Sequence, residues 1–359
     1  MFLVASRCSG VAVALFLLVA TTMPPRALAD AKIPAAGESL IEQRRNREAV
    51  AYFDRYLQQH SSDANGFLGR GMANANLRQD QAAINDLTRS ISLSATAKAY
   101  AARGQVLVHQ HAIKQALADF EEATRLEPKD GWYFDRYGLI LTGLHRWDDA
   151  SEWIGKACAL DPRNDIYWTD RSRAASKGGD EPSAIKYALK AVSLGSKEER
   201  PYEYLAKIAM RKKNYEQAIE YAQKGLAAEK TCEDCLTTIA ETYTQMKQPE
   251  KAVEFINAKL KELPLVVPRD RGLLFKLYTD RARAYYAMGK YQQALADYTH
   301  VAEKLRSKGA DADIYTERGV LLKKMGRQKE AAADFETAAT IEHAQVNDYS
   351  TDPLMGGHM

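Results

Sequence analysis

Residues 97–130 read AKAYAARGQVLVHQHAIKQALADFEEATRLEPKD, and residues 131–164 read GWYFDRYGLILTGLHRWDDASEWIGKACALDPRN. The two stretches are consecutive copies of one pattern. Matching residues in the two copies lie 34 positions apart, as in Gly104 and Gly138, Ala116 and Ala150, Ala123 and Ala157, and Pro128 and Pro162. A fixed period in this range is typical of stacked structural repeats, in which each unit contacts only its neighbours.

Each copy contains two segments whose apolar residues recur at helical spacing, and a short turn joins them. A proline preceded by an acidic residue, Glu127–Pro128 in the first copy, ends the second segment. Small residues such as Gly104 and Ala116 let two antiparallel helices approach closely, and a large aromatic residue, Tyr100, fills the space between them. Such a hairpin cannot bury its apolar face alone. The sequence therefore predicts an all-α protein of stacked helical hairpins.

The segment Ala116–Leu117–Ala118–Asp119–Phe120, the Ala123 that follows it and the closing Pro128 resemble the second half of the tetratricopeptide repeat. The resemblance implies an α-solenoid of about eight to nine helix–turn–helix hairpins that form a right-handed superhelix. It also implies a scaffold role, in which the first helices line a groove for an extended or helical peptide. The resemblance covers roughly residues 30–345 and does not identify the partner.

An alanine at the start of each second helix sets the register of the repeats. It recurs at Ala49, Ala83, Ala116, Ala150, Ala184, Ala218, Ala252, Ala294 and Ala331. The windows defined in this way begin near residues 30, 64, 97, 131, 165, 199, 233, 275 and 312. The first window contains Pro34 and Gly37, so its first half is expected to form only a short helix. Residues 263–272 and 306–313 are expected to be longer connections, and residues 346–359 an irregular tail.

Residues 1–29 have the features of a secretory signal peptide. Arg7 precedes an apolar run at 11–20, and Ala27–Leu28–Ala29 is a cleavage site of the small-x-small type. The apolar run is shorter than the roughly 20 residues that span a membrane comfortably. The sequence therefore predicts export to the periplasm or out of the cell, with no membrane span after cleavage. An uncleaved anchor is the alternative.

The composition and motifs favour a binding protein over an enzyme. The 359 residues are 27% charged with a formal net charge of +3, which is too small a balance to indicate a nucleic-acid partner. Phosphate-loop, dinucleotide-binding, zinc-protease and serine-hydrolase motifs do not occur. We therefore expect no cofactor, no metal and no catalytic residue, and we expect the partner to be a protein or peptide.

Cys232 and Cys235, with Glu233 and Asp234 between them, form the one motif with a chemical alternative. In an exported protein the two cysteines can form a structural disulfide, whereas a thiol oxidoreductase would use them as a redox pair. The two intervening acids would raise the thiol pKa, and no βαβ pattern surrounds the motif, so a structural disulfide is favoured. Cys158 is expected to be buried and unpaired. A self-assembling structural protein that stacks through its C-terminal end is a further alternative.

In four windows an arginine precedes the small residue of the first helix, and an aspartate precedes the large apolar residue of the second. These pairs are Arg70–Asp86, Arg103–Asp119, Arg281–Asp297 and Arg318–Asp334. Their co-occurrence predicts a salt bridge between the two helices of each hairpin, for which the planar guanidinium is suited. Arg171 is the exception and is expected to face Tyr187.

Basic residues recur at the first-helix positions that the register places in the groove. They are Arg173, Lys177, Arg200, Lys207, Arg211, Lys276 and Arg283, with Lys323 and Lys324 in the last window. Asp234 and Glu241 interrupt the run. The pattern favours an acidic peptide or a C-terminal carboxylate as the partner group. The alternative is that these residues form ordinary solvated faces.

Overall fold

A computed structural model describes residues 32–263, 270–305 and 312–350, with side chains up to residue 343. These residues form 18 α-helices and one π-helical segment, and no strand occurs among them, so the predicted all-α class is confirmed. The predicted signal peptide and most of both predicted connections, 263–272 and 306–313, lie outside the described residues. Helix contacts divide the chain into two units, Met1–Glu127 and Pro128–Met359.

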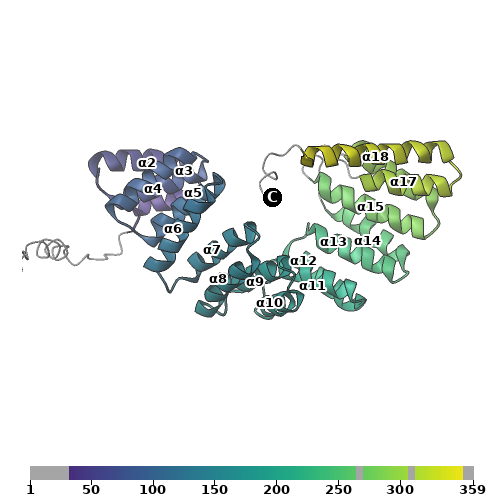
Figure 1. The fold of residues 1–359 in the computed structure, drawn as a ribbon, viewed down its shortest axis with the longest axis horizontal. Helices are drawn as coiled ribbons and strands as arrows, with labels where there is room; N and C mark the ends of the chain where they lie inside the picture. Colours follow the sequence, from purple (N-terminus) through teal and green to yellow (C-terminus); the bar gives the residue numbers. More distant parts are fainter. Residues whose placement is uncertain (1–31, 264–269, 306–311, 351–359) are drawn as a thin grey trace, which may run out of the picture. The chain divides into compact units, whose positions relative to one another are not determined.

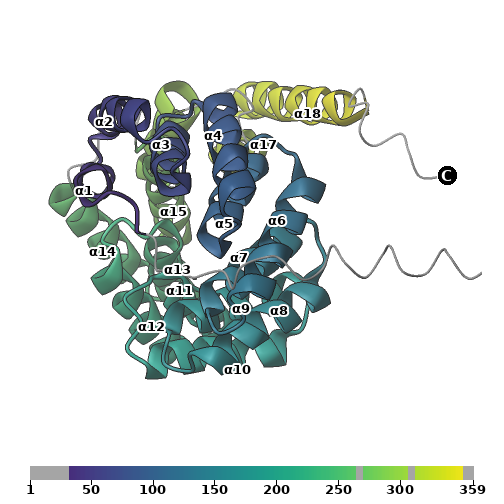
Figure 2. The same ribbon diagram turned by 90° about the vertical axis from the view of Figure 1, so that its left-hand side faces the viewer.

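The first unit contains three helical hairpins, coloured purple to blue in Figure 1. Its helices are α1 (Ala35–Glu42), α2 (Asn46–Gln59), α3 (Ala64–Asn76), α4 (Asp80–Leu93), α5 (Ala97–His109) and α6 (Ile113–Leu126). Each hairpin packs on the next, as Figure 2 shows for α3, α4 and α5. The short α1, with 8 residues, is the helix expected in the degenerate first window.

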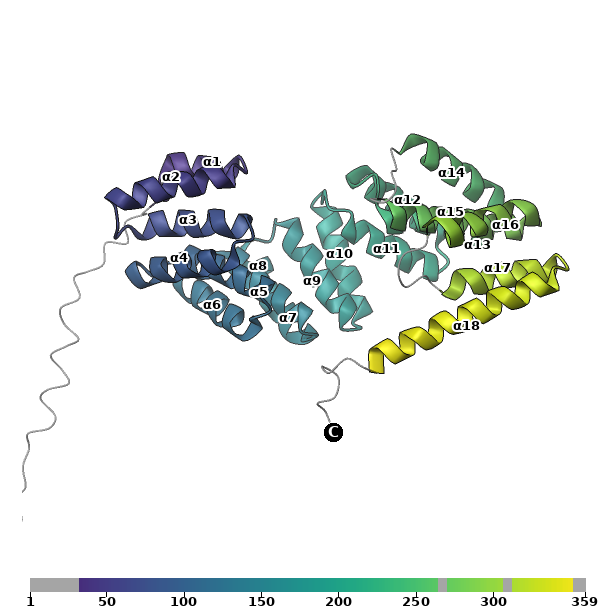
Figure 3. The same ribbon diagram turned by 90° about the horizontal axis from the view of Figure 1, so that it is seen from above.

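The second unit continues the same arrangement through the rest of the described chain. Its helices are α7 (Gly131–Gly143), α8 (Trp147–Leu160), α9 (Asp165–Lys177), α10 (Glu181–Ser193), α11 (Arg200–Arg211), α12 (Tyr215–Ala228), α13 (Glu233–Gln245), α14 (Pro249–Glu262), α15 (Arg271–Ala287), α16 (Tyr291–His300), η1 (Val301–Leu305), α17 (Ala312–Lys324) and α18 (Gln328–Ser350). The two helices of each hairpin lie side by side, as Figure 3 shows for α17 and α18. Successive first helices, from α7 through α9, α11 and α13 to α15, also contact one another. They form a continuous layer.

The helix boundaries follow the predicted windows with two differences. α15 begins at Arg271, earlier than the window near residue 275. α18 continues to Ser350, so residues 346–350 are helical where an irregular tail was predicted. The sequence from Gln328 to Ser350 contains neither proline nor glycine, and nothing in it forces the helix to end.

Close contact between the two helices of a hairpin depends on small residues, as predicted. All nine register alanines are buried, with at most 2% of their surface exposed. A Cβ added to Gly104 would lie 2.9 Å from the ring of Phe120, and one added to Gly138 would lie 2.5 Å from the side chain of Ile154. A larger residue at either position would therefore push the helices apart.

The turn inside each hairpin contains one residue with positive φ. In the described chain these residues are Arg44, Arg78, His111, His145, Gly179, Lys213, Lys247, Gly289 and Gly326. Their spacing repeats the spacing of the register alanines. A left-handed residue at this point ends the first helix and lets its last carbonyls accept hydrogen bonds from the turn. The sequence did not reveal this feature because most of these residues are not glycine.

All four predicted arginine–aspartate bridges are present. In each, Nε and Nη2 of the arginine donate to the two carboxylate oxygens of the aspartate at 2.7–2.9 Å. The guanidinium also lies 4.8–5.7 Å from the centroid of the aromatic ring three residues earlier. The sequence analysis missed this second contact, which helps to hold the arginine in place.

Two repeats without the bridge have an aromatic contact at the same place. Tyr137 and Trp153 occupy the positions of Arg103 and Asp119 one repeat later, and their rings stack at 4.1 Å. The guanidinium of Arg171 lies 4.3 Å from the ring centroid of Tyr187, as predicted. In these two hairpins, a ring contact therefore joins the helices at the level where four other hairpins have the ion pair.

Candidate functional site

A groove of about 740 Å³ lies along the first helices of the second unit. Residues of α9, α11, α13, α15 and α17 line it, so its wall comes from five successive hairpins. A neighbouring hollow of about 240 Å³ lies between α9 and α11 and shares Lys177 and Glu203 with the groove. The first helices face this groove because the second helices pack behind them.

The structure brings most of the predicted basic residues to this surface. Five of them line the main groove: Lys177, Lys207, Arg211, Lys276 and Arg283. Arg173 and Arg200 line the smaller hollow. Lys323 and Lys324 are exposed near the end of α17 and are not among the described residues that line either space.

The groove is not uniformly basic, which corrects the charge expected from the sequence. Its described lining contains as many acidic as basic residues: Glu203, Asp234, Glu241, Asp280 and Asp313. Most of the cations are paired with acids from adjacent helices. The sequence pattern gives the position of a residue on its own first helix. It does not show which side chains of adjacent helices pair with one another.

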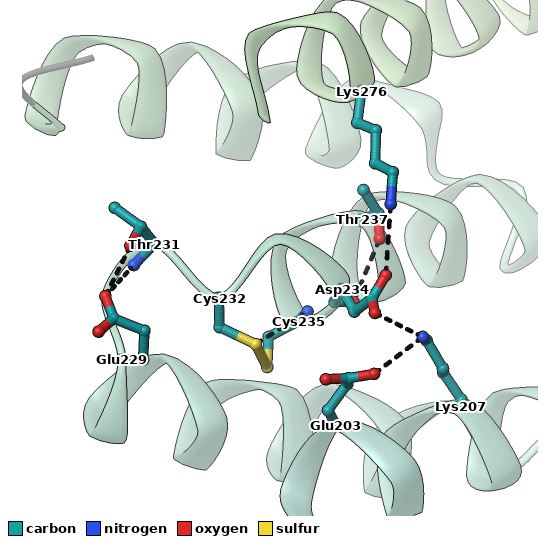
Figure 4. Close-up of a disulfide and its surroundings, with 9 residues drawn as sticks. All are labelled: Glu203, Lys207, Glu229, Thr231, Cys232, Asp234, Cys235, Thr237 and Lys276. Atoms are coloured by element: carbon teal, nitrogen blue, oxygen red, sulfur yellow. Dashed lines mark hydrogen bonds and ion pairs between the residues drawn. A yellow bond between two sulfur atoms is a disulfide. The ribbon is translucent and has the colours of Figure 1, made fainter. Parts of the chain in front are cut away.

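Asp234 joins two of the groove lysines from different hairpins (Figure 4). Lys207 Nζ lies 2.8 Å from Asp234 and 3.0 Å from Glu203, and Lys276 Nζ lies 3.5 Å from Asp234. Burial opposes ionisation of Asp234, but its hydrogen bonds with Glu203 and Lys207 and the nearby lysine charges hold its pKa at about 2. This network fixes both lysines, so neither presents a free charge to a ligand.

The basic residues at the α9–α11 end of the groove differ in whether an acidic residue pairs with them. Arg200 lies 3.0 Å from Asp170 and Arg173 lies 3.5 Å from the same carboxylate. Arg211 pairs with Glu181 of α10. Lys177 is exposed and makes no ion pair or hydrogen bond with any described side chain. The end of the groove at Lys177 is therefore its most available basic point.

The disulfide between Cys232 and Cys235 stands at the start of α13 (Figure 4). Their Cα atoms are 5.3 Å apart, and Cys232 is the residue that precedes the helix. Both cysteines are buried, and the absent side chain of Gly225 leaves room for the sulfur of Cys235. Because the disulfide closes the first turn around Asp234, it also positions the carboxylate that binds Lys207 and Lys276. This arrangement is structural in character, and a partner thiol has little access to it.

Cys158 is a free thiol in the interior of α8, as expected. Only 2% of its surface is exposed, and burial raises its pKa to about 12, although nearby Arg171 favours the thiolate. A thiol with this pKa is almost entirely protonated near neutral pH and is a poor nucleophile.

The described residues contain no cluster of histidine, cysteine or acidic side chains that could hold a metal ion. Within the same residues, no helix is long and apolar enough to cross a membrane.

Comparison with known proteins agrees with this architecture. The tetratricopeptide repeat model matches residues 35–98 and 279–345. These two segments of the chain are therefore similar to tetratricopeptide repeats. Proteins built from such repeats are generally protein-interaction scaffolds.

Individual relatives are distant and support the fold alone. Human tetratricopeptide repeat protein 6 is 24% identical over 136 residues, which are 38% of this chain and 26% of that protein. The match therefore spans about a quarter of that relative's length. A tetratricopeptide repeat protein from Parabacteroides merdae is 18% identical with a TM-score of 0.52, covering 68% of this chain and 93% of that one. A chain of the APC/C hetero-tetramer Cut9–Hcn1 is 15% identical with a TM-score of 0.50, covering 82% of this chain and 56% of that one.

Proposed function

We propose that this protein is an exported scaffold whose first-helix groove binds an extended or helical segment of a partner protein. The groove of about 740 Å³ carries the proposal, because five successive hairpins contribute polar and apolar side chains to one continuous surface. Binding sites of this kind combine apolar contact area with a few polar groups that fix orientation. A peptide can lie across several repeats and contact each of them in turn.

The α9–α11 end of the groove is suited to an acidic group of that segment. Lys177 has no described ion-pair partner, and Arg173 and Arg200 line the adjoining hollow together with the hydroxyl groups of Ser176 and Tyr204. A carboxylate placed there can accept charge-assisted hydrogen bonds from lysine and arginine. The acids further along the groove oppose a nucleic-acid partner, because they would repel a run of phosphates.

An oxidising compartment reached by export fits both the sequence of residues 1–29 and the bonded cysteines. Disulfides such as Cys232–Cys235 persist in oxidising compartments and are rare in the cytosol. The same disulfide is buried among apolar residues, which favours a structural role over the thiol oxidoreductase alternative. Detection of the chain in the periplasmic or secreted fraction, without residues 1–29, would test this part of the proposal.

Selection of a phage-displayed library of random dodecapeptides on the full chain tests the groove. Peptides that carry an acidic residue are expected to be enriched. Charge reversal by Lys177→Glu should weaken their binding about tenfold. Lys186→Glu is the matched control, because it makes the same charge change on an exposed face of the second helix α10. Equal weakening by both variants, or binding that neither changes, would refute binding in this groove.

A further inference from the structure

The opposite end of the groove has a negative balance of charge. Glu241 of α13 and Asp280 of α15 line the groove there, together with Arg283. Arg283 Nη2 lies 2.6 Å from Glu317 of α17, and its Nη1 lies 3.3 Å from Oδ1 of Asp280. The hydroxyl of Tyr298 also donates to Glu317, at 2.8 Å. Two carboxyl groups, those of Glu317 and Asp280, thus share one guanidinium, and Glu317 binds it at the shorter distance. Glu241 adds a further negative charge to this end of the groove.

Asp280 is buried without a full set of hydrogen-bond partners. Its surface is 5% exposed, and its Oδ2 atom has no hydrogen-bond donor among the described residues. The adjacent hydroxyl of Thr279 cannot serve as that donor, because it donates to the carbonyl of Phe275 at 2.8 Å. Buried carboxyl oxygens in native proteins usually have a partner, so an oxygen of this kind at a groove wall indicates a missing donor.

Glu241 provides a second, separate observation at the same place. Its half-buried carboxylate lines the groove and makes no ion pair or hydrogen bond with any side chain that the structure describes. The neighbouring hydroxyl of Thr242 donates to the carbonyl of Thr238 at 2.6 Å and is unavailable to it. Among the described residues, Glu241 therefore lacks a cationic partner, and Asp280 on the neighbouring first helix shares Arg283 with Glu317 through its Oδ1 alone.

We propose that Glu241 and Asp280 bind a lysine or arginine side chain of the partner segment. This inference rests on the proposed function of the groove and adds the chemistry of a second contact. A cation there would supply donors to both carboxylates and would balance the local negative charge. With an acidic group at Lys177 and a basic group at Glu241 and Asp280, the segment could bind in only one direction.

The ionisation of Asp280 makes this contact sensitive to pH. Burial and the charge of Glu241 raise the pKa of Asp280 to about 7, with Glu317 acting in the same direction and Arg283 opposing them. Tyr298 of α16 is the further titratable group that faces this cluster. A bound cation favours the ionised carboxylate. Affinity for a basic segment should therefore increase from pH 6 to pH 8 as Asp280 loses its proton.

The test uses a peptide selected on the full chain from the random dodecapeptide library. Synthetic versions of the peptide carry either its basic residue or norleucine, and each is titrated against the wild type, Glu241→Gln and Asp280→Asn. Glu216→Gln, an exposed acid on the second helix α12, is the matched control. The basic peptide should bind about tenfold more weakly to the two groove variants and equally to the control, as expected for a lost charged hydrogen bond.

The norleucine peptide should bind the wild type and the two groove variants alike, and Asp280→Asn should remove the pH dependence of the basic peptide. Selected peptides that have no basic residue, or an equal effect of the groove variants on both synthetic peptides, would overturn the inference and leave the proposed groove intact. A library that yields no groove-dependent binder would overturn the proposed function and this inference together.

Discussion

The bridge between Arg103 and Asp119 should be a main source of stability in its hairpin, and Arg103→Met tests this. The change keeps an unbranched apolar side chain in place of the aliphatic part of arginine but removes both hydrogen bonds to Asp119, of 2.8 and 2.7 Å. The Asp119 side chain is 7% exposed and that of Arg103 is 21% exposed, so the carboxylate would remain buried without a partner. Loss of one member of a fully buried pair costs about 3–5 kcal/mol. Partial exposure of the arginine lowers the expected cost to about 2–3 kcal/mol.

Arg125→Met is the matched control, because Arg125 and its partner Glu122 are 67% and 40% exposed. Its effect on the free energy of unfolding is expected to be negligible, because solvent screens an exposed ion pair. The double variant Arg103→Tyr, Asp119→Trp reproduces the ring pair of Tyr137 and Trp153 in the next repeat and should recover much of the loss, because it leaves no buried charge unpaired.

Urea unfolding followed by circular dichroism measures the global effect, and hydrogen exchange in α5 and α6 measures opening of the hairpin itself. The local measurement matters because repeat proteins can open one unit at a time. If Arg103→Met and Arg125→Met lower the stability of this hairpin equally, the bridge does not stabilise the repeat as argued.

Three further changes test other parts of the structure. Gly225→Ala should destabilise the protein by about 1–3 kcal/mol in urea unfolding, since the new Cβ would lie 2.5 Å from the sulfur of Cys235, whereas Gly143→Ala has open space and should be neutral or stabilising. Cys158 should resist iodoacetamide in the native protein at pH 8 and react only after unfolding, and rapid labelling of the native state would contradict its burial and its pKa of about 12. The pKa of Asp280 in the folded protein, about 7, lies above the unfolded value of about 3.9. Its contribution to the free energy of unfolding is therefore complete below the unfolded pKa and is lost as pH rises through the folded pKa. Asp280→Asn should therefore gain stability relative to the wild type between pH 5 and pH 8 in urea unfolding, and a constant difference across that range would show that Asp280 does not titrate in this way.

The sequence alone determined the repeat and the interior of each hairpin. The period, the buried alanines and the close contact at Gly104 could be predicted because they depend on residues within one hairpin. The bridge from Arg103 to Asp119 is of the same kind, since its two residues are 16 positions apart on helices joined by one short turn. Helical periodicity and a fixed turn length are enough to bring such residues together.

The turn conformation and the charge of the groove were decided by the tertiary structure. A left-handed residue is required in each turn, but His111 and Lys213 meet this requirement without glycine and therefore give no clear sequence signal. Lys207, Asp234 and Lys276 come from three hairpins, and whether their side chains meet depends on how far each hairpin rotates against the next. A repeat period gives the position of a residue on its own helix and does not give this rotation. The sequence could therefore place the lysines in the groove, whereas only the stacked structure shows that Asp234 pairs with them and that Oδ2 of the buried Asp280 lacks a hydrogen-bond donor among the described residues.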